Sequence, residues 1–475
     1  MTPKRPAIVP VEVWEQAPEP VQVVMSAMVE YYEQRIAQLE AEVRELTARL
    51  NQTSQNSSKP PSSDGPHVKR KPPKPPSGRN PGGQPGHAPH QRTLVPIDQV
   101  EQVIPCKPEQ CRRCGERLRG SDPQPWRHQV VELPPVRPHI TEYQRHRLKC
   151  AHCGITTCGD LPVGVGPTYY GPRLAGVVAL CTGGYRMSKR MVASFCRDVL
   201  GIELSLGEVS PIEQMVTSAV APAVEEAAVY VQSCDLNIDE TPWKERGKRC
   251  TLWTMVTTQL SVFAITTGRS VAVLQELVGE WYCGFLTSDR AKVYDSYALR
   301  KRQVCWSHLL RDFQAMIDRG GPGQVVGEAL LEHARVVFAW WHWVRDGTWQ
   351  RSTFQSYVQT LRASFTIELD WGTQNACPKT AATCRELLAR EAALWTFVRV
   401  EGIDPTNNAA ERSLRGAVLW RKMSFGTQSE RGSRFVASML TVLLSCQQQQ
   451  RNALAYLTAC CQAFYANRPI PSLVP

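Results

Sequence analysis

The strongest constraint on the fold is the alternation of strand and helix patterns between residues 229 and 310. Apolar and β-branched runs at 230–241, 250–260 and 261–268 predict three consecutive strands. A helix is expected at 271–281 and a fourth strand at 284–289. A further helix and a strand at 302–308 follow. This order predicts an α/β core in which the first three strands are antiparallel neighbours.

Acidic residues stand at two of these strand ends. Asp239 closes the first strand-like run and Asp289 the fourth, as in a ribonuclease H-like fold, where these positions are neighbours. A third carboxylate, Glu411, lies in the run 404–415, where Thr406 or Asn407 can cap a new helix. Three carboxylates brought together suit two Mg²⁺ ions about 3.5–4 Å apart across a phosphodiester.

Other assignments of the acidic residues remain open. Asp235 shares a strand face with Asp239 by the period of two, Glu240 is expected to face the other way, and Asp295 follows Asp289 too late to lie on the strand. Each aspartate taken alone is equally consistent with a turn or a helix cap. The order of the elements together with Glu411 favours the catalytic interpretation.

Far more chain separates Asp289 from Glu411 than one helix requires. We therefore expect a helical insertion at 313–400 within a core formed by 229–312 and 401–446, followed by a C-terminal helix and tail at 447–475. The tryptophans of the insertion form either an aromatic helix core or a surface that stacks on an unpaired base; they are Trp340, Trp341, Trp343 and Trp349. Basic residues after Glu411 suit contact with a DNA backbone or a surface ion pair; they are Arg412, Arg415, Arg421 and Lys422.

Two CxxCG turns predict a structural zinc site in residues 105–162. Cys111 with Cys114, and Cys150 with Cys153, each present two thiolates, and together they complete a tetrahedral Zn²⁺ site. The intervening stretch 126–150 is expected to form two strands around a Pro-Pro break. Substitute ligands are Cys106, Cys158 and His152, and free core cysteines are the alternative. A closed four-thiolate site stabilises a fold and does not catalyse.

The N-terminal region contains a heptad pattern followed by a basic linker. Apolar residues recur at alternating spacings of four and three within 20–51, which predicts a dimeric coiled coil or one amphipathic helix packed on its own chain; they are Met25, Val29, Tyr32, Ile36, Leu39, Val43, Leu46 and Leu50. Residues 52–104 are rich in Pro, Gly, Ser and basic residues, and cannot bury a core. They form a spacer that can also contact phosphates without sequence preference.

Residues 170–228 are helical in pattern. The pattern matches the plan of a helix-turn-helix DNA-binding region, although any small helical bundle shows the same spacing. It consists of apolar runs at 173–185 and 188–201, a turn at 201–205 and a further run at 206–230. Pro211 belongs in the first turn of a helix, so the last helix is expected to restart at Ser210.

Length and composition limit the possible classes of protein. A chain of 475 residues suits about three domains. The net charge of +11 is compatible with a polyanionic partner. The 17 cysteines are an odd number and the N-terminus lacks an apolar signal core, which indicates a reduced, intracellular protein. No apolar run reaches the roughly 18–20 residues that cross a bilayer, so a membrane partner is not expected.

Several motifs together resemble the insertion-sequence-66 family of transposases. They are NSSKPPSSD at 56–64, GGQPGH at 82–87, the two CxxCG turns, IDET at 238–241, CWSH at 305–308 followed by LLRDF, and NNAAERSLR at 407–415. The resemblance implies a multidomain DDE transposase whose ribonuclease H-like catalytic core is interrupted by a helical insertion. It places the triad on Asp239, Asp289 and Glu411, and His308 becomes a possible neighbour of the active site or a core histidine. Relatives often have a Gly-rich turn where this chain has SDRAKVYDSY at 288–297.

The expected activity is Mg²⁺- or Mn²⁺-dependent phosphoryl transfer on DNA. The enzyme would cleave at the terminal inverted repeats of a mobile element and join the freed 3′ ends to target DNA, without a covalent protein–DNA intermediate. Synapsis of two ends implies a homodimer or higher oligomer, and the resemblance suggests companion proteins of the same element and a place in the bacterial cytoplasm, associated with the nucleoid. The alternatives are a nuclease that cuts without joining and a catalytically silent DNA-binding regulator.

Overall fold

The computed structural model describes residues 5, 9–57, 64, 93–166 and 168–475. At its centre lies a five-stranded sheet with the strand order β5-β4-β3-β6-β7. The strands of this sheet are β3 (Leu236–Glu245), β4 (Lys248–Val256), β5 (Ser261–Thr266), β6 (Leu286–Ser288) and β7 (Arg302–Val304). β3, β4 and β5 pair antiparallel, whereas β6 pairs parallel with both β3 and β7. The fold is therefore multidomain and mixed α/β, as predicted.

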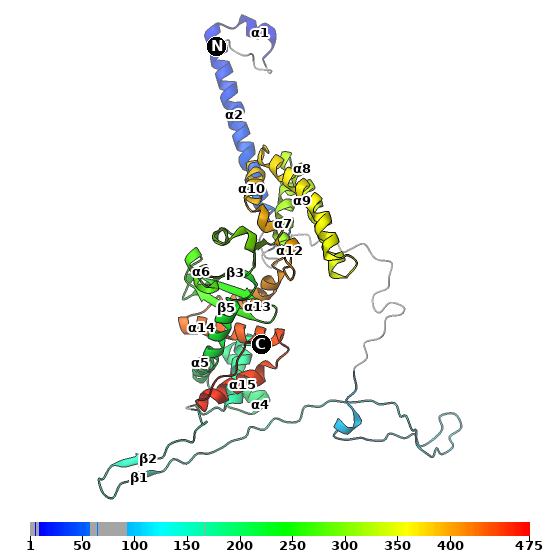
Figure 1. Ribbon diagram of the computed structural model, residues 1–475, viewed down its shortest axis with the longest axis vertical. Coiled ribbons are helices and arrows are strands. Elements are labelled where there is room, and N and C mark those ends of the chain that lie inside the picture. The colour runs from blue at the N-terminus through cyan, green and yellow to red at the C-terminus, as the bar shows by residue number, and fades with distance from the viewer. Residues whose placement is uncertain (1–4, 6–8, 58–63, 65–92, 167) are drawn as a thin grey trace.

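The two faces of the sheet are covered by different helices. One face buries Ile238, Met255 and Val262 in a core shared with α5 (Leu206–Val231) and α6 (Val271–Val278). The other face buries Trp243 and Leu252 against α13 (Asn408–Ser424) and α14 (Glu430–Gln448). This alternation along β3 and β4 follows from the period of two in a strand. The sheet lies between the inserted helices and the helices α4, α5 and α15 (Figure 1).

Two of the predicted strand boundaries are wrong. The first strand starts at Leu236 and not at residue 230, because Tyr230 and Val231 complete the last turn of α5. The last strand ends at Val304, because Trp306 begins α7 (Trp306–Asp318). In both cases the apolar residues suit either a helix or a strand, and their packing in the folded protein makes them part of a helix.

Helices fill the chain between the sheet strands and α13, as expected for 313–400. They are α7, α8 (Pro322–Arg345), α9 (Arg351–Thr373), α10 (Pro378–Ala389), α11 (Glu391–Leu394) and α12 (Thr396–Arg399). They share a second core in which Trp306, Phe365 and Trp395 lie with ring centroids 4.9–5.7 Å apart. Val304 belongs to this core as well, so the end of the sheet is packed directly against the inserted helices.

The helical region before the sheet is continuous with it through α5. It comprises α3 (Pro172–Ala179), a π-helical turn η3 (Leu180–Gly184) and α4 (Lys189–Leu200), and α15 (Ala453–Tyr465) packs against α3 and α5. The predicted restart at Ser210 is wrong. α5 begins at Leu206 with a capping box between Ser205 and Glu208 and runs through Pro211. Burial along the length of α5 outweighs the single backbone hydrogen bond that this proline removes.

Toward the N-terminus the structure contains the helices α1 (Val11–Gln16) and α2 (Glu19–Leu50), and a short 3₁₀ turn η2 (Ile97–Gln99) follows later. Residues 58–63 and 65–92 of the basic linker predicted at 52–104 lie outside the described residues. The two strands expected around the Pro-Pro break within 126–150 do not form: residues 126–146 contain no strand. Only the end of this stretch, β1 (Arg147–Lys149), pairs with β2 (Thr156–Cys158) in a hairpin around the second CxxCG turn. In the described parts of the chain, every helix is too short or too polar to span a bilayer.

The remaining short elements connect the sheet strands. Two 3₁₀ turns, η4 (Lys292–Ser296) and η5 (Leu299–Lys301), occupy the connection from β6 to β7, where a helix was expected. They keep the chain after Asp289 close to the sheet edge, and this placement determines the surroundings of the candidate site.

Candidate active site

Parallel pairing of β3 and β6 places two aspartates side by side. Asn237 is paired with Thr287 in the register of these strands. Asp239 and Asp289 each lie two residues beyond this pair, so both follow the same strand face at the same edge of the sheet. Local bonds fix the two carboxylates: Asp239 accepts from the backbone N–H of Glu240 at 2.9 Å, and Asp289 from that of Ala291 at 2.8 Å.

Helix α13 brings Glu411 to the same edge. Asn407, at the N-cap position, donates its side-chain amide to the main-chain oxygen of Ile238 at 2.8 Å and does not cap α13 with its side chain. The backbone N–H of Trp306 donates to the main-chain oxygen of Pro405 at 2.9 Å, which fixes the approach to the helix. Glu411 therefore stands in the first turn of a helix anchored to β3, close to Asp239.

The electrostatics of Asp239 reflect this convergence. Burial raises its pKa well above the ordinary value of 3.8, and the negative charges of Glu240, Asp289 and Glu411 raise it further. Like charges that repel in one site are relieved by a cation. Asp239 therefore lies within electrostatic reach of Asp289 and Glu411. Among the described residues, the oxygens of these three carboxylates do not form a group within 4.8 Å of one another.

Glu240 faces the other side of the sheet from Asp239, as the period of two predicts, and its carboxylate is buried beside Tyr294 of the core that contains Ile238. Its side chain is 6% exposed, accepts from the Tyr294 hydroxyl and is ion-paired with Arg269. Burial and the charge of Asp289 raise its pKa to about 7. On that face the 3₁₀ turn η4 places the Tyr294 hydroxyl against the Glu240 carboxylate. Only the adjacency to Asp239 could have signalled its role.

His308 lies directly beside Glu411. Its Nδ1 is 3.6 Å from Oε1 of Glu411, and Arg311 Nη2 is 3.7 Å from Oε2. Within the described part of the chain, both His308 Nδ1 and Glu411 Oε1 are buried without a hydrogen-bond partner. Burial lowers the pKa of His308, so its imidazole is neutral and can act as a ligand. A nitrogen and an oxygen at this separation can share one ion with bonds of about 2.0–2.2 Å.

Cys305 completes a group whose donor atoms, with those of His308 and Glu411, lie within 4.8 Å of one another. Its Sγ already accepts from the backbone N–H of Asn407 at 3.1 Å, and burial raises the pKa of the thiol to about 11. A protonated, hydrogen-bonded thiol is a poor ligand for a hard cation. Cys305 therefore anchors α13, and within the described residues the donor atoms of this group that remain without a hydrogen bond are His308 Nδ1 and Glu411 Oε1.

The two CxxCG turns have the same local geometry but lie apart. The backbone N–H of Cys111 donates to Glu116 and that of Cys150 to Ile155, and Gly115 and Gly154 both adopt positive φ. Backbone hydrogen bonds at each turn lower the pKa of Cys111 and of Cys150, as thiolate ligands require. Among the described residues, the four cysteines are not gathered within liganding distance. Zinc binding by Cys111, Cys114, Cys150 and Cys153 stays a prediction.

The rival acidic residues have structural roles. Asp235 accepts from the backbone N–H of Phe285 at 2.8 Å beside the β3–β6 pairing. Asp295 forms ion pairs with Arg302 and Arg390. Of the basic residues after Glu411, Arg421 donates to Thr241 and Pro242 on β3, whereas Arg412 and Arg415 are exposed.

The inserted tryptophans are divided between a core and the surface. Trp341 is buried at 8% exposure against Phe354 and Phe397, so it belongs to the helix core. Trp343 is 40% exposed and packs edge-on against Trp349 with ring centroids 4.7 Å apart. Trp341 therefore fits the prediction of an aromatic helix core, and Trp343 has the exposure that stacking on a base requires.

Comparison with known proteins identifies the family of the chain. Residues 11–93 match a family of unknown function (DUF6444). The chain is 25% identical over 203 residues to the uncharacterized protein y4qI of Sinorhizobium fredii, a match that covers 39% of this chain and 36% of that protein. The chain thus spans about a third of the length of this relative. Residues 169–434, more than half of the chain, match the model of the transposase IS66 family. The chain therefore belongs to the IS66 transposase family.

Proposed function

We propose that the protein is a DDE-type DNA transposase. It binds the terminal inverted repeats of a mobile element, cleaves the DNA and joins the 3′ ends to target DNA by divalent-ion-dependent phosphoryl transfer. The observation that carries the proposal is the convergence of Asp239 and Asp289 on neighbouring parallel strands with Glu411 on a helix anchored to β3.

The core has the arrangement of a ribonuclease H-like domain. Three antiparallel strands are followed by two strands parallel to the first, with the first strand at the centre. In this layout the first and fourth strands end side by side, so their carboxylates can share ligands. Residues 229–312 and 401–446 form this core, and 313–400 are the insertion.

The site residues suit divalent ions and a phosphodiester. Asp239, Asp289 and Glu411 would hold Mg²⁺ or Mn²⁺, with His308 beside Glu411. The chemistry that such ions supply when bound is a lowered pKa of the attacking water and neutralised charge on the leaving oxygen. The exposed Arg412 and Arg415 continue along α13 from Glu411 and are placed to contact the DNA backbone. The residues thus position the phosphodiester without a protein nucleophile.

The other segments supply DNA recognition and assembly in this proposal. The CxxCG segment at 105–162 forms a zinc ribbon, and α3, α4 and α5 within 170–228 form a helix-turn-helix-like DNA-binding region. Helix α2 leaves Ile36, Leu39 and Val43 exposed, which suits a second copy in a coiled coil. Two copies can hold two DNA ends, and companion proteins of the same element are further partners.

The experiment that tests the function is cleavage of the flanking terminal repeats by purified full-length protein in Mg²⁺. Asp239→Asn should abolish cleavage and leave repeat binding in EDTA unchanged. Asp235→Asn is the matched control, because Asp235 lies four residues before Asp239 on the same face and an asparagine still accepts from the backbone N–H of Phe285. Full cleavage by Asp239→Asn refutes the assignment.

Product analysis separates the alternatives. A transposase gives strand-transfer products in which the repeat ends are joined to target DNA, whereas a nuclease gives nicked ends alone. A catalytically silent regulator binds the repeats equally well in EDTA and in Mg²⁺ and never nicks them. The intact set of three carboxylates favours the transposase.

A further inference from the structure

The loop after β6 that carries Asp289, residues 288–296, is held by a fully buried arginine. Arg302 of β7 is 0% exposed. Its Nη2 donates to the main-chain oxygen of Asp289 at 2.8 Å, its Nε to the Ser288 hydroxyl at 3.2 Å, and its Nη1 to Asp295 at 2.8 Å. The guanidinium of Arg302 therefore contacts the Asp289 loop at three points: Ser288 at its start, the main chain of Asp289, and Asp295 near its end.

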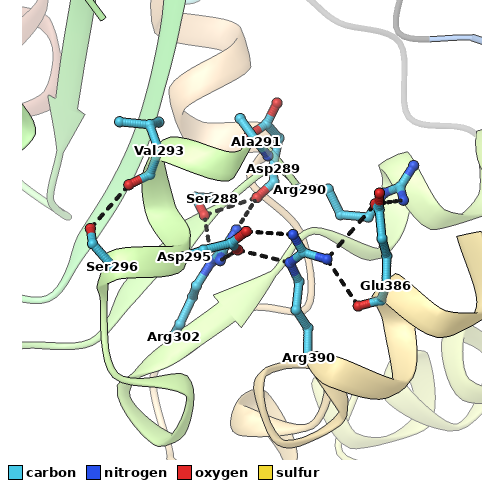
Figure 2. Close-up of polar contacts among 10 residues, drawn as sticks. All are labelled: Ser288, Asp289, Arg290, Ala291, Val293, Asp295, Ser296, Arg302, Glu386 and Arg390. Carbon is cyan, nitrogen blue, oxygen red and sulfur yellow. Dashed lines mark hydrogen bonds and ion pairs between the residues drawn. The ribbon is translucent and has the colours of Figure 1, made fainter. Parts of the chain in front are cut away.

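The inserted helices contact the other side of Asp295. Arg390, which follows α10 and is 7% exposed, forms a bidentate pair with Asp295, with Nε–Oδ1 and Nη2–Oδ2 distances of 2.8 and 2.5 Å. Its Nη1 donates to the main-chain oxygen of Glu386 at 2.9 Å. Figure 2 shows Asp295 between Arg302 from the strand and Arg390 from the helix. The carboxylate of Asp295 thus bridges the sheet and the insertion.

A second arm of the network starts at the residue next to Asp289. Arg290 pairs with Glu386 of α10 at 3.0 Å and with Asp312 of α7 at 3.0 Å. Together the network contains the three arginines Arg290, Arg302 and Arg390 and the three carboxylates of Asp295, Asp312 and Glu386, so its formal charges balance. Figure 2 shows all of these residues except Asp312. The side chain of Arg290 is therefore tied directly to the helices α7 and α10. The main-chain oxygen of Asp289 is tied to Arg390 through two residues, Arg302 and Asp295.

The network is more elaborate than packing of the insertion requires. Apolar contacts such as those of Val304 and Trp306 already join the sheet end to the inserted helices. Buried ion pairs are costly to desolvate, and apolar residues of similar volume often replace them without loss of stability. Their distinctive contribution is orientation, because the planar guanidinium of an arginine fixes the position and angle of the group that accepts its hydrogen bonds. Here the geometry that they fix is that of the loop bearing Asp289.

We propose that the helical insertion positions Asp289 for ion binding through this network, with Arg390 and Asp295 as positioning residues. The inference rests on the proposed function, because it assigns Asp289 to the ion-binding set. Displacing a liganding carboxylate by a fraction of its bond length weakens ion binding even where the fold and the DNA-binding surface are intact. Loss of the Arg390–Asp295 ion pair should therefore weaken the binding of divalent ions and leave DNA binding unchanged.

The test uses Arg390→Met and Asp295→Asn in the full-length protein. The matched control is Arg362→Met, which removes an equally close bidentate ion pair between Arg362 and Glu391. Glu391 belongs to α11 and not to the Asp289 loop. The readouts are Mn²⁺ affinity, measured by electron paramagnetic resonance of free Mn²⁺, the Mg²⁺ dependence of terminal-repeat cleavage, and repeat binding in EDTA.

We expect both network variants to bind Mn²⁺ at least tenfold more weakly than the parent protein and to need correspondingly more Mg²⁺ for cleavage. Their binding to the terminal repeats should be unchanged. Arg362→Met should match the parent protein in all three measurements. Arg390→Lys, which keeps the charge but loses the fork, covers the case in which Arg390→Met fails to fold, and it should be intermediate. Folded Arg390 variants with parental Mn²⁺ affinity overturn the proposal. If the parent protein binds Mn²⁺ through Asp239 but never cleaves DNA, the proposed function fails while the positioning role stands.

Discussion

The side-chain amide of Asn407 donates to the main-chain oxygen of Ile238 at 2.8 Å, and this bond joins the start of α13 to β3 one residue before Asp239. Asn407 is fully buried, and its backbone N–H also donates to Cys305 Sγ at 3.1 Å. One residue thus links the strand of the first carboxylate to the helix of the third and to the residue that follows β7.

Asn407→Ala should lower both stability and cleavage. The change leaves the buried oxygen of Ile238 without its partner, which costs about 1–3 kcal/mol. Urea unfolding in EDTA measures the loss, and repeat cleavage should fall more steeply than stability because Glu411 moves with α13. Asn408→Ala is the control, since Asn408 is exposed and makes only a long contact of 3.4 Å with Ser307. Parental cleavage by folded Asn407→Ala would contradict this link.

Removal of divalent ions should destabilise the parent protein but not Asp239→Asn. The raised pKa of Asp239 means that its charged form opposes folding, and this cost is fully present above the raised pKa and disappears as the pH falls toward the ordinary value. At pH 8 in EDTA, Asp239→Asn should therefore melt above the parent. Saturating Mg²⁺, at about 100 times its Kd, should add about 2.7 kcal/mol to the parent alone. An equal Mg²⁺ response in both proteins argues against Asp239 as a ligand.

Glu240→Gln should change the pH dependence of stability in EDTA. Because the folded pKa of Glu240 is raised from 4.5 to about 7, the parent loses stability relative to the variant as the pH rises between these values. The loss levels off within about one pH unit above the folded pKa. The difference should grow by at most about 3 kcal/mol over this window. Urea midpoints at pH 4.5, 6, 7 and 8 measure it. A constant difference across the series would show that Glu240 titrates normally.

Zinc should bind once per chain and hold residues 105–162 together. The ion supplies on the order of 10 kcal/mol or more to sites of this type, so chelation should unfold the segment and expose it to proteases. Cys111→Ser and Cys150→Ser should each abolish zinc retention, measured by metal analysis of purified protein, whereas Cys106→Ser and Cys158→Ser retain it. Thiols that stay fully reactive in the presence of zinc would exclude the site.

Helix α2 should set the oligomeric state. Leu39 and Leu46 are 44% and 50% exposed, so burial against a second copy removes apolar surface from water. Deletion of residues 1–50, or Leu39→Glu with Leu46→Glu, should lower the mass measured by light scattering. Gln34→Glu, on the opposite side of the heptad, leaves the mass unchanged. A truncated protein of unchanged oligomeric state would assign α2 to packing within one chain.

Local pattern was sufficient for most of the core elements. Strands at 250–260 and 261–268 and the helix at 271–281 were predictable, because runs of β-branched residues and a 3.6-residue period depend only on near neighbours. The motifs containing Asp239, Asp289, Glu411 and His308 were readable in the same way. The sequence by itself therefore determined the α/β class, the membership of the family and the identity of the candidate residues.

Only the tertiary structure decided how those residues face one another. Strand alternation placed Glu240 on the correct face but could not show its contacts with Tyr294 and Arg269. Nothing local to Asp289 pointed to Arg302, Asp295 and Arg390, whose partners lie up to 95 residues apart. The run 126–150 carries strand-like residues, yet strands form only around the second CxxCG turn, where partners are available. Ion pairs, strand partners and burial depend on residues far apart in sequence, so the positions of the charges follow from packing and not from any single stretch of the chain.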